Sequence, residues 1–384
     1  MGTMSKRFNA KEFRRIVIKI GSSLLTDGSE GAIRQEWLEG FGKDVAALRS
    51  DGREVVLVSS GAIAVGRGHL GMRRRILKLE EKQAAAAVGQ IRLSYVYQQV
   101  LRTHGLSVAQ LLLTIGDTEQ RRRYLNARNT METLLRFGIV PLVNENDTVA
   151  TEEIRFGDND RLAARVAEMA SADLLVLLSD IDGLYTSDPN VDSGAKRLGT
   201  VQEITPEIEE MAGASQSDIG SGGMITKVEA AKIAVAAGCH VVIAAGNSQH
   251  SLTALGEDAP CTWFVASRSP MTARKNWIMT NLKPVGRLTI DKGAGAALLA
   301  GKSLLPPGVL SVQGNFERGD AVVVADGCGR EIAVGISAYS AIDARRILGH
   351  KSGEIAKILG YRGREEIIHR DDLALSGTDA GDET

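Results

Sequence analysis

Short apolar runs alternate with amphipathic segments along the first two-thirds of the chain. Between the runs lie segments with apolar residues at helical spacing, among them 34–50, 82–105 and 223–238. The runs themselves are rich in β-branched residues and read RRIVIKIGSS, REVVLVSSG, SVAQLLLT, IVPLVNEND, ADLLVLLSD and HVVIAAG. Strands and helices that alternate in this way form a parallel sheet with both faces covered. The pattern therefore predicts an α/β fold with an open, mostly parallel sheet sandwiched by helices.

The pattern changes after about Ser267. Short strand-like runs separated by Gly, Pro and Asp turns follow, which is typical of a small, mostly β, barrel-like unit. One or two helices and a charged, helical end are expected within it. The boundary is predicted between Leu282 and Val285, which gives a first domain at 1–282 and a second at 283–375. The polar end at 376–384 is predicted to be disordered.

Composition narrows the class of protein. The chain has 384 residues, 43% of them hydrophobic, which is enough for a large core and two domains. Its net charge of −1, without a long block of like charge, argues against a strong nucleic-acid or anionic-membrane footprint. The three cysteines lie far apart, so neither a disulfide framework nor a zinc site is expected. No apolar run reaches the roughly 20 residues of a spanning helix, and a cytoplasmic protein without a membrane segment is predicted.

A dense group of acidic and amide side chains lies between Val140 and Leu162. Asn144 to Asp147 follow an apolar run, and Asp158 to Asp160 precede a helical pattern. Ligands of open α/β sheets bind beyond the carboxyl ends of the strands, so this stretch is a candidate binding loop. The alternative is a solvated turn, because Asn, Asp and Gly are ordinary loop residues.

Two other strand ends suit anionic groups. The first run ends at Lys19 and Gly21, where an ammonium and backbone N–H groups could meet a phosphate; a surface lysine beside a tight turn is the alternative. The second run closes on Ser59, Ser60 and Gly61, small residues that let a helix N-terminus face a carboxylate. A serine N-cap, worth about 1 kcal/mol, is a compatible interpretation.

Residues for a nucleotide are predicted further along. The stretch from Gly220 to Lys227 opens an alanine-rich helix, and its glycines and lysine could clamp terminal phosphates. A flexible linker before a helix is the alternative. The run ending in Ser179 and Asp180 offers a place for a base and ribose.

Two short matches to phosphate-binding motifs are set aside. The glycines at 66–71 fit GxGxxG, but they follow a helical stretch and lack an acidic residue at the expected distance, so the match is attributed to chance. The GKS at 301–303 resembles the end of a P-loop. However, Ala296 replaces the required glycine and Pro306 would break the next helix, so a turn is expected.

Taken in order, the motifs of the chain resemble the amino-acid kinase superfamily and, within it, the glutamate 5-kinases. The resemblance extends over essentially the whole chain. It rests on IVIKIGSSLLT, VVLVSSGAIAVGRGHLG, KQAAAAVGQ, LNARNT, VPLVNENDTVAT, FGDNDRLAA, LLSDIDGLYTSDP and GSGGMITKVEAA. The part from GRLTIDKGAGAALL to IIHRDD is similar to the PUA domain that bacterial glutamate 5-kinases carry.

The resemblance implies a reaction and its ligands. The γ-phosphoryl group of ATP would pass to the side-chain carboxylate of L-glutamate, giving γ-glutamyl phosphate in the first step of proline biosynthesis. Mg²⁺ is implied as well, held mainly by phosphate oxygens and water, with no protein ligand assigned. Proline as a feedback inhibitor and a homo-oligomer, either dimer or tetramer, are also implied.

The resemblance also implies roles for individual residues. Lys19 and Lys227 would neutralise charge on the transferring phosphoryl, with Asp160 orienting them. Ser60, Gly61, Asp147 and Asn159 would bind the substrate. The ATP-binding residues would be Lys19, Gly21, Ser179, Asp180, Ser221, Gly222, Gly223, Met224, Ile225, Thr226 and Lys227. Ser179 departs mildly from the threonine of many relatives and keeps the hydroxyl.

Two alternatives remain open. A sibling acid kinase would act on acetylglutamate, aspartate or carbamate, although the loop NENDTVATEEIRFGDND favours free glutamate. RNA binding through the second domain is disfavoured, because its basic residues are scattered among acids with few aromatics to stack bases. These basic residues are Lys283, Arg287, Lys292, Lys302, Arg318 and Arg330.

Overall fold

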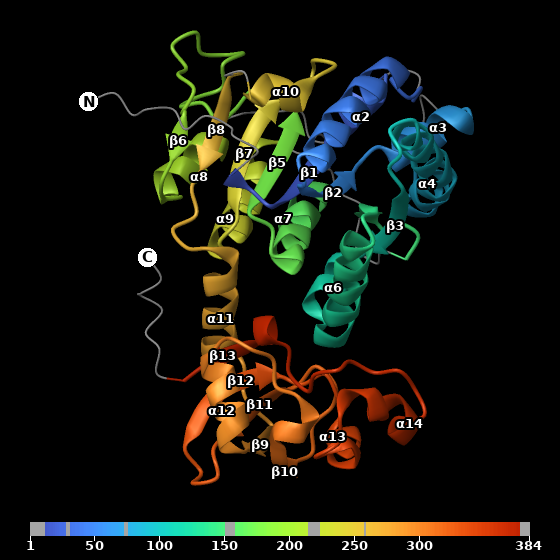
Figure 1. The fold of residues 1–384 in the computed structure, drawn as a ribbon. Helices are drawn as coiled ribbons and strands as arrows, with labels where there is room; N and C mark the ends of the chain where they lie inside the picture. Colours follow the sequence, from blue (N-terminus) through green and yellow to red (C-terminus); the bar gives the residue numbers. More distant parts are fainter. Residues whose placement is uncertain are drawn as a thin grey trace. The chain divides into compact units, whose positions relative to one another are not determined.

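The computed structural model describes residues 12–27, 31–72, 76–149, 158–213, 223–256 and 259–376. The chain divides by its internal contacts into two compact units, residues 1–270 and 271–384 (Figure 1). Helix α11 (Pro270–Asn281) therefore packs almost entirely with the second unit, whereas the predicted boundary near 282 leaves it in the first. The predicted disordered end lies outside the described residues except for Ser376.

The first unit is built on an eight-stranded sheet in the order β3-β4-β2-β1-β5-β7-β8-β6. Six of its strands run parallel and coincide with the six predicted runs; β8 lies antiparallel to β7, and the short β6 pairs with β8. The strands are β1 (Arg15–Ile20), β2 (Glu54–Ser59), β3 (Val108–Leu113), β4 (Val140–Glu145), β5 (Leu174–Ser179), β6 (Thr200–Val201), β7 (His240–Ala245) and β8 (Cys261–Phe264). The predicted α/β fold with a mostly parallel sheet is confirmed.

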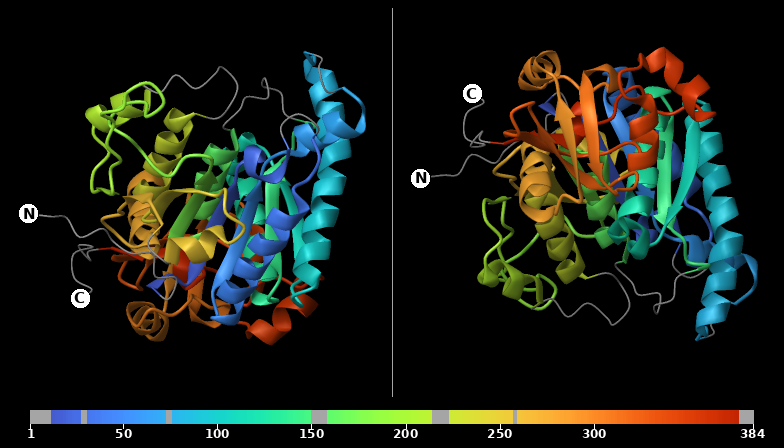
Figure 2. Two further views of the ribbon diagram at one scale, coloured as in Figure 1. Left: turned by 90° about the horizontal axis from the view of Figure 1, so that it is seen from above. Right: turned by 90° about the horizontal axis from the view of Figure 1, so that it is seen from below.

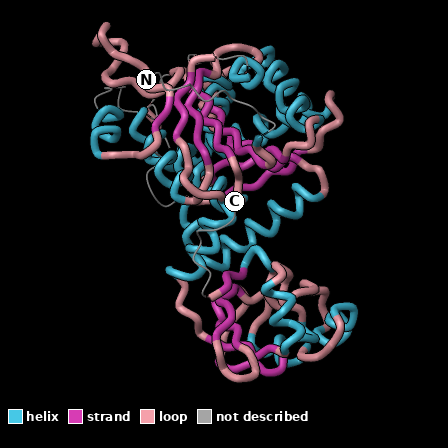
Figure 3. The backbone as a smooth tube through the Cα atoms, turned by 60° about the vertical axis from the view of Figure 1, so that its left-hand side comes forward, coloured by secondary structure: helices cyan, strands magenta, loops and turns pink. Residues whose placement is uncertain are grey.

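Helices cover both faces of this sheet, which forms the middle layer of the first unit (Figures 2 and 3). One apolar cluster packs α6 (Arg121–Arg136), α7 (Asp158–Ala170), α8 (Pro206–Gly213) and α9 (Met224–Ala236) on one face. A second packs α1 (Ser22–Leu25), α2 (Gln35–Ser50), α4 (Leu79–Arg102) and α10 (Ser251–Gly256) on the other. Two further helices are α3 (Ala62–His69) and α5 (Ile115–Glu119).

Strand β1 is buried on both faces, because it lies between β2 and β5. Ile16, Ile18 and Ile20 join the cluster with α2 and α4, whereas Val17 joins the cluster with α7 and α9. Side chains alternate along a strand, so Lys19 lies on the same face as Val17. The fold therefore directs this lysine towards α7 and α9.

Helices α3 and α4 pack so closely that two glycines are required between them. A Cβ on Gly66 would lie 1.8 Å from the carbonyl oxygen of Ala85, and one on Gly89 would lie 1.8 Å from that of Ala62. Gly66 and Gly68 lie inside helix α3, and of the glycines in the GxGxxG match Gly66 is needed for helix packing.

We expect Gly89→Ala to lower the free energy of unfolding by about 3 kcal/mol, since the added methyl forces α3 and α4 apart. The gain in helix propensity, about 1 kcal/mol, is too small to offset the clash. Gly213→Ala at the end of α8 is the matched control, because no atom lies within 4 Å of its added Cβ. Urea unfolding of both variants measures the difference; equal midpoints would show that the close approach is not needed.

The second unit contains a five-stranded sheet in the order β10-β9-β11-β12-β13. Its strands are β9 (Gly286–Ile290), β10 (Val309–Gly314), β11 (Ala321–Ala325), β12 (Glu331–Ile336) and β13 (Leu373–Leu375). The expected mostly β unit is confirmed, although it carries α12 (Lys292–Leu299), α13 (Ala341–Ile347) and α14 (Ile355–Leu359) besides α11. The expected charged, helical end contains α13 and α14, and it closes with the short strand β13, which pairs with β12. Gly301, with φ +74°, ends the turn after α12, as expected for a sequence that is not a P-loop.

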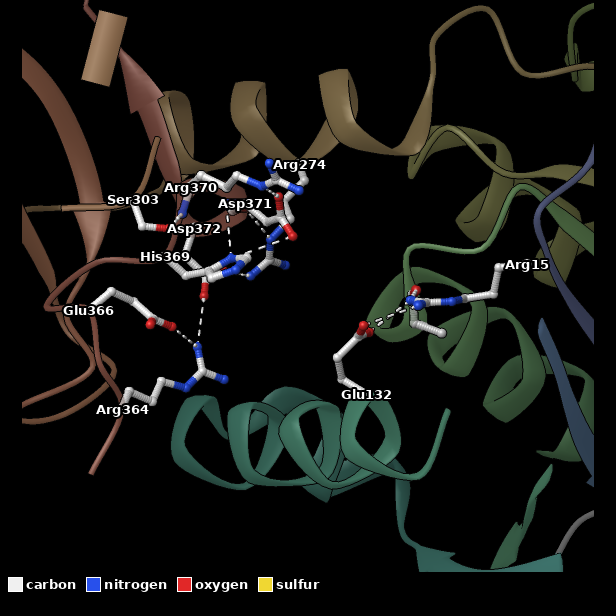
Figure 4. A network of polar contacts seen from close by, with 11 residues as sticks. Arg15, Glu132, Arg274, Ser303, Arg364, Glu366, His369, Arg370, Asp371 and Asp372 are labelled. Atoms are coloured by element: carbon white, nitrogen blue, oxygen red, sulfur yellow. Dashed lines mark hydrogen bonds and ion pairs between the residues drawn. The ribbon is translucent and has the colours of Figure 1, made fainter. Parts of the chain in front are cut away.

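Helix α11 is joined to the second unit by a nearly buried ion pair (Figure 4). The Arg274 guanidinium lies 2.5 Å from an Asp372 carboxylate oxygen, and the two side chains are only 8% and 10% exposed. Arg274 Nε also donates to the carbonyl oxygen of Asp371, in the 3₁₀ turn η4 (Arg370–Asp372).

We expect Arg274→Met to destabilise the second unit by about 3 kcal/mol, because it leaves the Asp372 carboxylate without this cation in a site with little water. Arg287→Met serves as the control, since its pair with Glu331 is 35% and 51% exposed and worth less than about 1 kcal/mol. Thermal unfolding followed by calorimetry compares the two variants. Similar changes in melting temperature for both variants would show that the Arg274–Asp372 pair does not join α11 strongly to this unit.

Within the described ranges, no helix is both long and apolar enough to cross a membrane.

Candidate active site

The carboxyl ends of several neighbouring strands meet at one edge of the first unit's sheet. Strands β4, β2, β1, β5 and β7 are parallel and adjacent, with Ile20 in register with both Ser59 and Leu178. The segments that follow these strands contain most of the predicted site residues. This edge is where open α/β sheets bind their ligands.

Two lysines share one buried carboxylate at this edge. Lys19 Nζ of β1 lies 2.5 Å from Asp160 Oδ1, and Lys227 Nζ of α9 lies 3.4 Å from Asp160 Oδ2. Asp160 is fully buried, and Lys19 and Lys227 are 7% and 5% exposed. The Thr226 hydroxyl donates to Asp160 Oδ2 at 2.9 Å. The structure thus brings together Lys19, Asp160 and Lys227, which are far apart in the sequence.

The electrostatics of this cluster favour an additional anion. Burial alone would raise the pKa of Asp160, but the charges of Lys19 and Lys227 hold it below its ordinary value. Burial lowers the pKa of Lys227, and the Lys19 charge adds to this effect while Asp160 opposes it. Lys19 and Lys227 share the one buried carboxylate of Asp160, and the Asp180 charge also acts on Lys227 and offsets part of the positive charge. The N-termini of α7 and α9 begin beside it and add partial positive charge.

The residues predicted for ATP lie on β1, β5 and α9. Gly21 begins α1 and donates its N–H to the carbonyl oxygen of Leu178 at 3.2 Å, which ties the end of β1 to β5. The Ser179 hydroxyl donates to Asp180 Oδ1 at 2.9 Å. Gly223 precedes α9, in which Met224 is buried and Ile225 is 48% exposed. Ser221 and Gly222 lie outside the described residues.

The residues predicted for the substrate follow β2 and β4, apart from Asn159, which lies on α7 next to Asp160 in the sequence. Asn159 Nδ2 donates to the Ser60 hydroxyl and to the Ser59 carbonyl oxygen, both at 2.9 Å. Gly61, with φ +94°, begins helix α3, and this left-handed conformation is one that glycine adopts without strain. Asp147 is half-buried in the turn after β4.

One polar atom at this position points to a ligand. Asn159 Oδ1 is buried, and no hydrogen-bond donor of the described chain reaches it. Buried carbonyl oxygens are nearly always paired, and leaving one unpaired costs about 1–3 kcal/mol. An acceptor of this kind suits an ammonium group next to the Lys19–Asp160–Lys227 cluster.

Asn144 belongs to the predicted binding loop but has no predicted role of its own. The structure shows its Oδ1 accepting from Asn159 Nδ2 at 3.0 Å. Its position at the end of β4, in the same loop as Asp147, was the signal available in the sequence. Thr226 was assigned to ATP, and its hydrogen bond to Asp160 could be recognised only in three dimensions.

No group of three or more His, Cys, Asp or Glu residues that could hold a metal ion occurs in the parts of the chain that the structure describes.

Two family models match the sequence of this chain. Residues 14–245 match the Amino acid kinase family, and residues 286–359 match the PUA domain. Among solved structures, UMP kinase from Bacillus anthracis has 15% sequence identity and a TM-score of 0.46, covering 67% of this chain and 98% of its own.

Curated relatives match over nearly the full length. The glutamate 5-kinase of Paramagnetospirillum magneticum is 58% identical, covering 95% of this chain and 98% of its own. The glutamate 5-kinase of Nitrobacter winogradskyi is 56% identical, covering 97% and 98%. The chain therefore belongs to the amino acid kinase family and, within it, to the glutamate 5-kinases with a C-terminal PUA domain.

Proposed function

We propose that this enzyme transfers the γ-phosphoryl group of ATP to the side-chain carboxylate of L-glutamate, the first step of proline biosynthesis. The observation that carries the proposal is the buried Asp160 carboxylate held between Lys19 and Lys227. Phosphoryl transfer depends mainly on positioning and on stabilising charge at the transferring oxygens. Two ammonium groups fixed by one carboxylate meet both requirements.

In this reaction a glutamate carboxylate oxygen attacks the γ-phosphorus while the bond to the β-phosphate oxygen breaks and ADP leaves. The attacking carboxylate is already ionised near neutral pH, so no general base is required. Lys19 and Lys227 stabilise the developing charge, and Asp160 orients both lysines. Mg²⁺ would be held mainly by the phosphate oxygens of ATP and by water, and it would neutralise phosphate charge.

The two substrates occupy different strand ends in this proposal. Ser179 and Asp180 lie against the base and ribose, and the described residues 223–227 with Gly21 lie against the phosphates. The α-ammonium group of glutamate, the phosphoryl acceptor, meets Asn159 Oδ1 and Asp147. Its α-carboxylate meets Ser60 and the amides at Gly61. The unpaired Asn159 oxygen supports this placement, because an ammonium supplies the missing donor.

Three further properties belong to the proposal. Proline shares the α-ammonium and carboxylate of glutamate, so we expect inhibition at an overlapping site. A homo-oligomer, dimer or tetramer, is the expected assembly. The cytoplasm is the expected location, and it fits the finding that Cys239, Cys261 and Cys328 form no disulfide bond.

The second unit is not proposed to bind RNA. Two of its six basic candidates are already paired with carboxylates, Arg287 with Glu331 and Arg330 with Asp326.

The proposal is tested by ADP release with a panel of acceptors. L-Glutamate, acetylglutamate, aspartate and carbamate are compared with ATP and Mg²⁺ present. Hydroxylamine traps an acyl phosphate as a hydroxamate, which identifies the product chemistry. We expect ADP and γ-glutamyl hydroxamate in equal amounts with L-glutamate. Faster turnover of another acceptor, or ADP release without hydroxamate, would refute the proposed reaction.

A further inference from the structure

A chain of buried amides connects the proposed acceptor site to helix α4. Asn159 Nδ2 lies 3.0 Å from Asn144 Oδ1 and shares its two hydrogens among this oxygen, the Ser59 carbonyl and the Ser60 hydroxyl. Asn144 Nδ2 donates to Gln90 Oε1 at 2.5 Å. Gln90 Nε2 in turn donates to the Ser94 hydroxyl at 3.2 Å, one helical turn further along α4. Asn144 and Gln90 are 2% and 8% exposed, so water has little access to these bonds.

Backbone groups fix the direction in which each amide faces. The Glu145 N–H can only donate, and it lies 2.9 Å from Asn144 Oδ1, so the Asn144 NH₂ must face away towards Gln90. The Ser59 carbonyl can only accept, so the atom of Asn159 that meets it is Nδ2. Asn159 Oδ1 is therefore the atom left for a ligand.

We infer that Gln90 is a positioning residue for the acceptor: it holds Asn144, and through Asn144 it presents Asn159 Oδ1 to the ammonium group of the substrate. Gln90 supplies the acceptor for the Asn144 NH₂. Without Gln90, the Asn144 NH₂ group is a buried donor with no acceptor. The Asn144 side chain can pair this donor only by rotating, and the rotation turns its Oδ1 away from Asn159. The inference deepens the proposed function and rests on it.

The position of Gln90 is itself fixed by the fold. Its neighbour Gly89 lies against the backbone of Ala62, the first residue of α3, and a Cβ there would lie 1.8 Å from the Ala62 oxygen. Gly61, the residue before α3, belongs to the proposed site for the α-carboxylate. The same helix contact therefore places both groups proposed to bind the α-carbon substituents of the amino acid. These are the amides at Gly61 for the α-carboxylate and the chain from Gln90 to Asn159 for the α-ammonium.

The test uses three variants of the full-length enzyme. Gln90→Met keeps the length of the side chain and removes the acceptor. Gln90→Glu keeps an oxygen acceptor at the same place. Gln98→Met makes the same change as the first variant at an exposed position of α4 and is the control. Two acceptor-site probes are used: L-glutamate as substrate, and glutarate, which has both carboxylates but no ammonium, as competitive inhibitor.

For Gln90→Met we expect the KM for glutamate to rise about tenfold, in line with the loss of one buried hydrogen bond. The Ki of glutarate, the KM for ATP and kcat should each stay within about threefold of wild type. Gln90→Glu should keep the KM for glutamate within about threefold, and Gln98→Met should match wild type. If Gln90→Met does not fold, Gln90→Ala is expected to show the same raised KM for glutamate with a nearly unchanged Ki of glutarate.

An unchanged KM for glutamate in the folded Gln90 variant overturns the inference, as does an equal loss of glutamate and glutarate binding. An equal loss would mean that Gln90 only supports the fold around the site. The proposed function fails separately, when the wild-type enzyme forms no γ-glutamyl hydroxamate.

Discussion

Lys227→Met should reduce kcat about 100- to 1,000-fold while the protein remains folded. Removal of one preorganised charge that acts on the transferring group typically costs this much. The fold should tolerate the change, because Asp160 keeps Lys19 at 2.5 Å and the Thr226 hydroxyl at 2.9 Å. The variant is measured by single-turnover formation of ADP at saturating substrates, with circular dichroism as the check on folding.

Lys232→Met is the matched control, because this lysine also lies on α9 but pairs with Glu209 and is 56% exposed. Its kcat is expected within about twofold of wild type. Full activity in Lys227→Met would remove this lysine from the proposed mechanism.

Asp160→Asn should lower the free energy of unfolding more than Lys227→Met does. It should also change the pH dependence of activity. Breaking a buried ion pair by removing one partner costs about 3–5 kcal/mol, and here both Lys19 and Lys227 lose the carboxylate. The difference in unfolding free energy between wild type and variant should be fully present above pH of about 4. The folded pKa of Asp160 lies below its ordinary value, so this difference should disappear as the pH falls through that folded pKa.

On the alkaline side of the pH profile, the Asp160→Asn enzyme is expected to lose activity at a lower pH than the wild-type enzyme. The Asp160 charge raises the pKa of Lys227, so its removal lowers that pKa and the ammonium form is lost earlier as the pH rises. Asp51→Asn, at an exposed position after α2, is the control for both measurements. If the Asp160→Asn enzyme loses activity at the same alkaline pH as the wild-type enzyme, Asp160 does not maintain the charge of Lys227.

The parallel part of the first unit's sheet could be predicted from the sequence. Each of the six long strands is a continuous apolar run, because both faces of the sheet are covered. Strands β6 and β8 were missed, since two and four residues are too short to show a period. Helix α6 was missed because only Met131 and Leu135 are buried along its charged sequence.

The site could be predicted in its residue types but not in its contacts. Lys19, Asp160 and Lys227 were assigned through the resemblance of their motifs to a known family. The sharing of one buried carboxylate depends on how β1, α7 and α9 meet, which no local pattern encodes. The bond from Asn144 to Gln90 joins positions 54 residues apart, so the role proposed for Gln90 also needed the structure.

The most direct test of the central claim is a crystal structure with ADP, Mg²⁺, aluminium fluoride and L-glutamate, in which aluminium fluoride mimics the transferring phosphoryl group. We predict that Lys19 Nζ and Lys227 Nζ both lie within about 3 Å of its fluorine atoms while Asp160 still contacts both lysines. Aluminium fluoride bound next to glutamate with either ammonium group turned away from it would contradict the account.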